Sequence, residues 1–479
     1  MSSRDRLIEA SKQISDRITK FVDNGSEISV ITHIDADGIT SGSIISRALA
    51  RMGARFSVRA VSEMNSAVIE TMKAEARDFY IITDLGGGWA SHLSKALGDR
   101  WIVIDHHEIS DQEILTDDGA RIFNAWKYGI DGGVDISAGG MAYLVASALG
   151  RGNKDLSQLA VVAAVGDRQD QGDKKSFLGQ NAEILKVAES NGLVKVDMDL
   201  LLVGRETRAL HEALAFTSSP YIEGLTWNRD SCHTLLKNAG INLKVEGRWR
   251  VLSEFSQEEK SAVLDAIAKH IATYGKGDSS VVGDLIGYVY TLTSEETRSQ
   301  LRDARGFSTL LNACGRIGKP GIGIAICLGD RSEMLSAGEE IISTYRNTLR
   351  NYISTIFADK WRIADDGRNV FVNGEGLVAE DMLGAVSSLL SGSPSLGHRL
   401  VFVRTLAGDG TYRFSSRKTT GTGADPNLGI LMRQVAESCG GTGGGHAAAA
   451  GCRIPSGVLE AFISSIKAAS NGSKSTATS

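Results

Sequence analysis

The sequence predicts an α/β protein that begins with a doubly wound parallel sheet. Short apolar, β-branched runs alternate with segments of helical periodicity in the first part of the chain. Acidic turns follow several of these runs, as expected where the carboxyl ends of parallel strands form a ligand crevice. The chain has 479 residues, which is too long for one hydrophobic core, so we expect several domains.

The first predicted domain, residues 1–194, opens with an amphipathic helix over 4–22, where apolar residues recur at helical spacing. Five strands follow, predicted at 28–32, 56–61, 79–83, 101–104 and 120–123. Helices are predicted from the first acidic turn to about residue 52 and at 65–76, 89–97, 137–149, 155–165 and 179–191. A Gly-rich loop separates the last strand from the last three helices. This order is typical of βα units and predicts a parallel sheet.

The pattern changes over residues 195–331, which we interpret as a mostly helical central insertion. Helices are expected near 203–217, 229–238 and 256–273, and strands at 281–292 and 322–328. Ser256 and Glu259 form the capping-box signature of the third helix. No catalytic constellation is visible in this part of the sequence.

Residues 332–360 predict a long connector helix, because apolar residues recur three to four positions apart; a buried core helix would show the same pattern. Residues 361–470 form a smaller predicted C-terminal α/β domain. Its strands are expected at 370–373, 399–404, 411–416 and 452–454, and its helices at 380–391, 426–438 and 457–469. The Ser- and Thr-rich tail, 471–479, is expected to be disordered.

Composition is that of an ordinary globular protein, with 42% hydrophobic and 23% charged residues. The net charge of −5 excludes a global polycation, so nucleic-acid binding would need a local basic groove and bound metal. Five Cys without a C-x-x-C pair disfavour structural zinc and indicate the reduced thiols of a cytoplasmic protein. No apolar run approaches the ~20 residues of a membrane span, and the N-terminus does not resemble a signal peptide.

The acidic turns carry the residue types that bind divalent metals. These residues are Asp35 and Asp37 after the first strand, Asp84 after the third, Asp105, His106 and His107 at the end of the fourth, and Asp167 at a helix end. Carboxylates and imidazoles gathered at one sheet edge repel or titrate unless a cation lies among them. We therefore predict a two-metal phosphodiester site, in which ions about 3.5–4 Å apart would activate water. Mixed oxygen and nitrogen ligands suit Mn²⁺, and Mg²⁺ is the alternative ion.

The positions of these residues suggest separate roles. Asp84 is expected to bridge the two ions, His106 to supply a nitrogen ligand, and Asp167 to complete the second ion. Asp105 is expected to orient an imidazole, and His107 to contact phosphate or donate a proton. Each motif alone is weak, since D-x-D-G is usually a turn and a His pair usually lies on the surface or in the core. Their combination in one alternating domain supports the prediction.

A second signal is the Gly-rich stretch before His446. Gly443, Gly444 and Gly445 would let backbone N–H groups approach a phosphate closely. So many glycines disfavour a helix here, and we expect a loop that enters packed structure; a flexible linker is the alternative.

Basic residues occur on a neighbouring predicted strand. Arg413, Ser415 and Arg417 alternate, so they share one face of that strand. Together with other basic residues between 398 and 404, they predict a surface for a polyanion. Arginines on a solvated strand face are the alternative.

Together these motifs resemble the DHH phosphoesterase superfamily. Its four motifs are similar to Asp35-Ala-Asp-Gly, Asp84, Asp105-His106-His107 and Gly166-Asp167. Gly443-Gly-Gly-His446 with Ser415-x-Arg417 resembles the associated DHHA1 substrate-binding domain. The order of the segments is most similar to that of archaeal RecJ-like nucleases of the GINS-associated type, relatives of a eukaryotic replisome protein that joins the MCM helicase and GINS.

This resemblance implies Mn²⁺-dependent hydrolysis of single-stranded nucleic acid from an end. It implies that Asp35 and Asp37 bind one metal each, that Asp84 bridges, and that His106 and Asp167 serve the second ion. His33 would be a further ligand or neighbour, and His107, Arg417 and His446 would hold the substrate phosphate. One departure is Asn124-Ala125, where the family often has Asn-Pro, which puts a role for Asn124 in doubt.

Three functions compete at this point. The first is an exonuclease on single-stranded DNA or RNA, which the complete ligand set and basic second domain favour. The second is a phosphodiesterase for short oligonucleotides or cyclic dinucleotides. The third is a replisome scaffold with GINS and MCM as partners, for which degenerate ligands would be expected.

Overall fold

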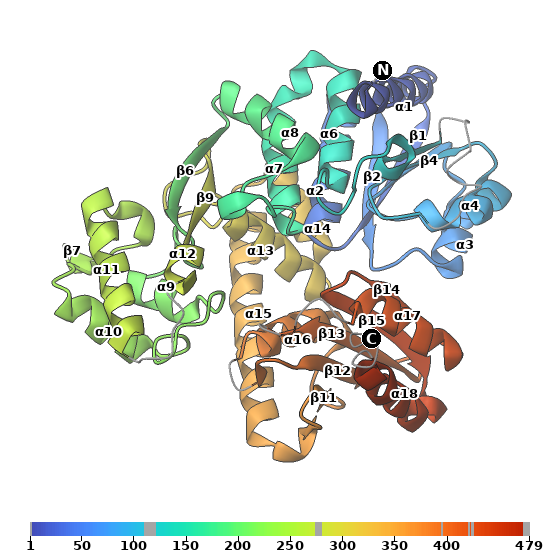
Figure 1. Cartoon of the computed structure of the whole chain (residues 1–479). Helices are drawn as coiled ribbons and strands as arrows, with labels where there is room; N and C mark the ends of the chain where they lie inside the picture. Colours follow the sequence, from blue (N-terminus) through green and yellow to red (C-terminus); the bar gives the residue numbers. More distant parts are fainter. Residues whose placement is uncertain are drawn as a thin grey trace. The chain divides into compact units, whose positions relative to one another are not determined.

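The computed structural model describes residues 2–109, 121–273, 280–393, 396–419, 422 and 426–472. The chain divides into two compact units (Figure 1). Unit 1 comprises Met1–Leu214 and Arg229–Ile342, and unit 2 comprises Ala215–Asn228 and Ser343–Ser479. None of the helices in the described ranges is both long and apolar enough to cross a membrane.

Unit 1 is built on a five-stranded sheet in which all strands are parallel, in the order β2-β1-β3-β4-β5. The strands are β1 Glu27–His33, β2 Arg55–Val61, β3 Phe79–Thr83, β4 Trp101–Asp105 and β5 Ile122–Asn124. The predicted doubly wound parallel sheet is therefore confirmed. Because the chain moves from β1 outward to β2 and then back to β3 on the other side of β1, the topological switch point lies between β1 and β3.

Helices cover this sheet on both faces. The helices of this part are α1 Ser3–Asp23, α2 Ala36–Arg51, α3 Ser66–Glu75, α4 Ala90–Leu97, α6 Ala138–Leu149, α7 Ser157–Gly166 and α8 Gly179–Ser190. Buried residues of α3 and α4 pack with Ile31, Tyr80, Ile82, Trp101 and Val103 in one core cluster. Helix α1 packs against α6, and α7 packs against both α2 and α6. Every residue of β3 and β4 is buried, as expected for parallel strands covered on both sides.

The central part of the chain contains three strands that the sequence did not predict, β6, β7 and β8. Its elements are β6 Val194–Leu200, α9 Leu210–Phe216, α10 Arg229–Asn238, β7 Lys244–Val245, β8 Arg248–Trp249, α11 Gln257–Thr273, α12 Ser280–Asp284, β9 Ile286–Leu292, α13 Ala304–Arg316 and α14 Pro320–Leu328. Strand β6 was not predicted; it pairs antiparallel with β9, which is shorter than the predicted strand 281–292.

The predicted strand 322–328 is wrong, because this segment is helix α14. Pro320 stands in its first turn and Gly329 adopts the left-handed conformation at its end, which are ordinary start and stop signals of a helix. The helix predicted near 203–217 is also shorter than expected, since α9 begins only at Leu210.

The long helix α15, Glu333–Ala358, leads into a six-stranded sheet in the order β10-β11-β12-β13-β15-β14. The strands are β10 Ile363–Asp365, β11 Asn369–Asn373, β12 Leu400–Leu406, β13 Thr411–Lys418, β14 Thr442–Gly445 and β15 Ala449–Pro455. The helices are α16 Leu383–Ser391, α17 Leu428–Ser438 and α18 Leu459–Gly472. Residues of α17 and α18 pack on Phe402, Phe414 and Ile454 in one core cluster.

Two features of this domain differ from the expected ones. Residues 442–445 form an edge strand paired with β15, where a loop was expected. Helix α18 continues to Gly472, into the tail expected to be disordered; residues 473–479 lie outside the described residues.

Candidate metal centre

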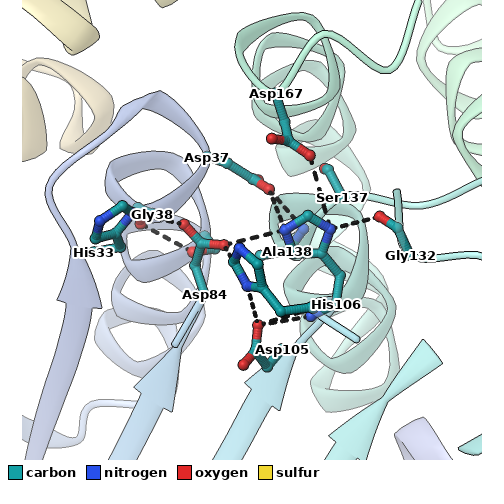
Figure 2. Close-up of polar contacts among 12 residues, drawn as sticks. His33, Asp37, Gly38, Asp84, Asp105, His106, Gly132, Ser137, Ala138 and Asp167 are labelled. Atoms are coloured by element: carbon teal, nitrogen blue, oxygen red, sulfur yellow. Dashed lines mark hydrogen bonds and ion pairs between the residues drawn. The ribbon is translucent and has the colours of Figure 1, made fainter. Parts of the chain in front are cut away.

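The acidic turns of unit 1 meet at the switch point of its sheet. Asp35 lies just beyond β1, Asp84 just beyond β3, and His106 just beyond β4. Asp37 lies in the first turn of α2, and Asp167 caps the end of α7. Figure 2 shows the side chains of Asp37, Asp84, His106 and Asp167 converging from these separate elements. The structure therefore brings together residues that lie up to 132 positions apart in the sequence (Asp167 minus Asp35).

Asp35 is held by the start of α2. It is the N-cap residue of that helix, and its Oδ1 accepts a hydrogen bond from the Gly38 N–H at 2.9 Å. Its Oδ2 lies 3.0 Å from Nδ1 of His33, the last residue of β1. The helix cap uses one carboxylate oxygen and leaves the other facing His33.

Asp37 is held by the N-terminus of another helix, α6. Its two oxygens accept hydrogen bonds from the N–H groups of Ala138 and Gly139 at 2.8 and 2.7 Å. A helix N-terminus carries partial positive charge and stabilises a carboxylate. Burial nevertheless raises the pKa of Asp37, and the neighbouring Asp84 carboxylate raises this pKa further.

Asp84 lies at the centre of the group and is 2% exposed. Its Oδ1 is 3.3 Å from Nε2 of His106, and its Oδ2 is 3.4 Å from Nδ1 of His33. Among the described residues, neither oxygen has a hydrogen-bond partner of acceptable geometry. A buried carboxylate without hydrogen bonds is costly, and a cation between the two histidines would remove that cost.

The orientation of His106 leaves one ring nitrogen facing the carboxylates. Its Nδ1 lies 2.6 Å from the carbonyl of Gly132, to which Nδ1–H donates. Nε2 then faces Asp84, and lies 3.6 Å from Oδ2 of Asp37. This is the arrangement of a metal-binding histidine whose second nitrogen is fixed by a carbonyl. Burial lowers the pKa of His106, but the surrounding carboxylates raise it well above the usual value, so metal and proton would compete for Nε2.

Asp105 lies behind the two histidines and is buried. Its Oδ1 accepts from the backbone N–H groups of His106 and His107 at 2.8 and 3.2 Å and from Nδ1 of His107 at 2.8 Å. Its Oδ2 accepts from the Gly87 N–H at 3.2 Å. Both oxygens are thus occupied by protein donors, and Asp105 orients His107, as the sequence suggested.

His107 is the exposed member of the pair, with 57% of its side chain accessible. Burial of the ring lowers its pKa, but the Asp105 carboxylate overcomes this effect and raises the pKa to about 9. The Asp105 carboxylate therefore favours the charged form of this ring, which lies on the open side of the group, where an anionic substrate would meet it.

The predicted ligands form two groups with no member in common, and within each group the donor atoms lie within 4.8 Å of one another. One group is His33, Asp35 and Asp84; the other is Asp37, His106 and Asp167. Asp84 also joins His106 and His107 in a third group, which links the first two groups through Asp84 and His106. Burial raises the pKa of Asp167, and Asp84 adds to this effect against the opposing His106. A cation favours the charged carboxylates, so the donor set and the orphaned Asp84 oxygens fit two divalent ions.

Several supporting residues were not predicted from the sequence. The Asn124 side chain, whose role was left in doubt, donates to the His107 carbonyl at 3.0 Å. Trp126 donates from Nε1 to the His106 carbonyl at 2.9 Å. Gln169 donates to Asp167 at 2.8 Å.

Helix α13, from a stretch in which no catalytic constellation was visible, braces the same turns. Asn312 accepts the Ala36 N–H at 3.0 Å through its side-chain oxygen. Arg305 pairs with Asp170 at 2.6 Å. A Cβ on Gly315 would lie 1.9 Å from the Ile34 carbonyl oxygen, so only glycine permits this approach.

The predicted basic strand, β13, faces helix α16 with its alternate residues. Ser415 Oγ lies 2.8 Å from Ser387 Oγ. Arg417 donates from Nε to Ser388 Oγ at 3.1 Å and from a terminal nitrogen to Ser415 Oγ at 3.2 Å. Arg413 lies on the same face and pairs with Glu380 at 2.9 Å. The predicted shared face is confirmed, and its arginines are held by protein contacts.

The glycines before His446 lie on the edge strand β14, opposite residues of β15. A Cβ on Gly443 would lie 2.5 Å from the Met432 carbonyl oxygen of α17, whereas a Cβ on Gly444 would meet only an arginine nitrogen at 3.9 Å. Gly443 therefore permits close packing of β14 on α17, and Gly444 lies in open space. His446 begins the turn into β15 and is exposed.

Comparison with known families matches three segments of the chain. The DHH family N-terminal domain model matches residues 27–166, the DHH-CID domain model residues 202–286, and the DHHA1 domain model residues 368–471. An uncharacterized protein of Methanocaldococcus jannaschii is 28% identical over 464 residues, 96% of this chain and 96% of its own.

Solved structures share the fold at low identity. RecJ of Thermus thermophilus in complex with Mn²⁺ has a TM-score of 0.58 and 16% identity; the match covers 97% of this chain but only 55% of that protein. An exonuclease RecJ bound to manganese has a TM-score of 0.56 and 16% identity, with 96% and 94% covered. CDC45 of Entamoeba histolytica has a TM-score of 0.60 and 14% identity, with 96% and 99% covered.

Proposed function

Because this chain belongs to the DHH phosphoesterase superfamily, with DHH, DHH-CID and DHHA1 domains in that order, we propose that it is a metal-dependent exonuclease. In this proposal it hydrolyses phosphodiester bonds of single-stranded DNA or RNA from an end, with two divalent ions. The observation that carries it is the buried Asp84 carboxylate, which lies without hydrogen bonds between two groups of metal-binding side chains.

The proposed ligands divide between the two ions. His33 and Asp35 would hold one ion, Asp37, His106 and Asp167 the other, and Asp84 both. When bound, the ions supply Lewis acidity, which polarises the phosphodiester and activates water near neutral pH. The mixture of carboxylate oxygens and imidazole nitrogens supports Mn²⁺, with Mg²⁺ as the alternative.

The residues of the chain position and protonate the substrate. Asp105 favours the protonated form of His107, which would contact a phosphate oxygen and donate a proton to the departing oxygen. Asp105 keeps the proton on His107 and fixes the direction of the ring. The hydrogen bonds that Asp37 accepts from the N-terminus of α6 keep its carboxylate in place during the reaction.

We assign substrate binding to the C-terminal domain, residues 361–470, and catalysis to residues 1–194. Ser415 and Arg417 on β13 would bind phosphate, and the backbone of Gly443–Gly445 with His446 would contact a neighbouring phosphate. The hydrogen bonds of Arg417 to α16 support this role, because they orient its guanidinium in advance. Residues 195–331 and the helix at 332–360 would form the bridging parts.

Digestion of strands labelled at the 5′ or the 3′ end, as DNA and as RNA, with and without Mn²⁺, tests the proposal. Stepwise shortening from one end that requires Mn²⁺ is expected. A wild-type protein that binds Mn²⁺ but leaves every strand intact would contradict it.

Two other functions remain to be separated from this one. A phosphodiesterase for oligonucleotides or cyclic dinucleotides would lose its rate as the labelled substrate lengthens, whereas a nuclease would keep it. The fold shared with CDC45 supports a second role as a replisome component, with GINS and MCM proteins as the proposed partners. Pull-down with purified GINS and MCM tests that role without reference to catalysis.

A further inference from the structure

We propose that Gln169 is the positioning residue for one of the two ions, because its buried amide sets the orientation of the ligands Asp167 and His106. This inference rests on the proposed function, since it concerns the ions of that same centre. Gln169 lies two residues after Asp167 and is 0% exposed, so its amide must find all its partners within the protein.

The amide of Gln169 connects the two ligands directly. Its Nε2 donates to Oδ2 of Asp167 at 2.8 Å and to the Gly132 carbonyl at 2.8 Å. That same carbonyl accepts the Nδ1–H of His106 at 2.6 Å. One side-chain amide therefore holds the carboxylate of one ligand and the carbonyl that directs Nε2 of the other.

The orientation of the amide is determined by its partners. Every oxygen beside Nε2 is an acceptor, including the Ile136 carbonyl at 3.3 Å. On the other side, Oε1 accepts the Asn181 Nδ2–H at 2.6 Å. A flipped amide would place oxygen against oxygen on one side and N–H against N–H on the other, so Asn181 fixes which end of Gln169 faces Asp167.

Asn181 extends the connection to the third ligand of the same group. It comes from α8, and its Oδ1 accepts the N–H of Ser137 at 3.3 Å. Ser137 is the N-cap of α6, the helix whose first N–H groups hold Asp37. In the described part of the chain, the hydrogen bonds of this amide pair do not reach His33 or Asp35.

Gln169 and Asn181 thus support the group of Asp37, His106 and Asp167, and within the described ranges their side chains make no hydrogen bond to His33 or Asp35. Partners that orient metal ligands commonly change metal affinity by about 10–100-fold when they are removed. We therefore expect loss of the Gln169 amide to weaken the binding of one ion and to leave the binding of the other unchanged.

The test is Mn²⁺ titration of the metal-free full-length protein by calorimetry, comparing wild type with two variants. Gln169→Met keeps the approximate volume and removes both hydrogen-bonding ends. Asn181→Asp keeps the acceptor for Ser137 but sets a carboxylate against Oε1, which favours rotation of the Gln169 amide away from Asp167. The matched control is Gln171→Met, because Gln171 donates to the neighbouring Gly133 carbonyl at 3.2 Å but is exposed.

Wild type and the Gln171 variant are expected to bind two ions with the same affinities. Both test variants should bind one ion unchanged and the other at least about tenfold more weakly. Their half-saturating Mn²⁺ for hydrolysis should rise by a similar factor, with kcat restored at high Mn²⁺. Melting of the metal-free variants shows whether the fold is retained.

Three outcomes would overturn the inference. Folded test variants that bind both ions within twofold of wild type would show that the amide does not position the ligands. If both ions bound equally more weakly, the amide would not act specifically on the group of Asp37, His106 and Asp167. A wild-type protein that binds no Mn²⁺ would refute both this inference and the proposed function. The first two outcomes, obtained with a wild-type protein that binds two ions, would refute the inference alone.

Discussion

Replacing Asp84 by Asn should show how the buried carboxylate lowers the stability of the metal-free protein and how it contributes to metal binding and hydrolysis. Asp84 has a φ of 63°, in the left-handed region that Asn tolerates better than most residues. Asn keeps the shape of the side chain, and its amide can both donate and accept towards His33 and His106. The substitution therefore removes the negative charge with little change in packing or backbone.

The expected effect on stability changes sign with metal. Both oxygens of Asp84 are buried without hydrogen bonds, and such an unsatisfied group costs about 1–3 kcal/mol. At a pH high enough to keep His33 and His106 neutral, the metal-free variant should thus be more stable than metal-free wild type by up to that amount, because no imidazolium then pairs with Asp84. Saturation at a hundred times the dissociation constant stabilises a protein by about 2.7 kcal/mol per ion, a gain that the variant should largely lose.

The effect on hydrolysis should be severe. A ligand shared by both ions contributes several kcal/mol of transition-state stabilisation, and a loss of about 4 kcal/mol corresponds to roughly a thousandfold in rate. Thermal melting with and without Mn²⁺, together with digestion of an end-labelled strand, measures both effects on the same preparations.

A buried aspartate with strong partners provides the control. Asp199 accepts from Arg205 and Lys260 at 2.7 and 2.6 Å, and breaking a buried ion pair costs about 3–5 kcal/mol. Asp199→Asn should therefore lower the melting temperature equally with and without Mn²⁺. The reasoning about Asp84 would be refuted by a variant that is strongly destabilised without metal yet keeps its full stabilisation by Mn²⁺.

Four further predictions concern the rest of the chain. Arg417→Ala should lower kcat/KM about tenfold or more, because a charge-assisted phosphate contact is lost; unchanged steady-state kinetics would show that β13 does not bind the substrate. Gly443→Ala should destabilise the C-terminal domain by about 1–3 kcal/mol through overpacking against α17, measured by denaturant unfolding. Gly444→Ala should leave stability unchanged and lower substrate affinity; unaltered binding of a labelled strand would argue against phosphate contact there. Hydrogen bonds from Arg250 hold the pKa of Glu259 at about 2, so the stability contributed by this pair is present above the unfolded value of about 4.3 and is lost as pH falls towards 2. Unfolding of Glu259→Gln should accordingly match wild type at pH 2 and differ most near neutrality, and a constant difference across this range would contradict the pairing.

The parallel sheet of unit 1 could be predicted because its inner strands are unambiguous. The segments of β3 and β4 read as continuous apolar runs, and their carboxyl ends carry Asp84 and Asp105. The switch-point rule then places these ends together without knowledge of side-chain contacts. The association of the strand-end ligands follows from topology, whereas the approach of Asp167 depends on how helix α7 packs.

Other features left no readable pattern. The apolar run of α14 is short enough to fit strand or helix, and its flanking Pro320 and Gly329 were the better signals. The glycines of β14 suggested a loop, whereas pairing with β15 and close packing on α17 make them a strand. Gln169 and Asn312 are single amides whose partners come from distant segments, so neither spacing nor composition reveals them.

The antiparallel pairing of β6 with β9 also determines how this chain can be shortened without disrupting the catalytic body. Leu200 lies opposite Ile286, so the segment between them leaves and rejoins the catalytic body at one place. A tight turn joining those two strands would excise the intervening segment, including the stretch Ala215–Asn228 that belongs to unit 2, and still return the chain to α13. Cutting the polypeptide at residue 194 would instead discard α13 and with it Asn312, which props the turn of Asp35. The catalytic body is thus contiguous in space but interrupted along the polypeptide, and a minimal version must be made by internal deletion.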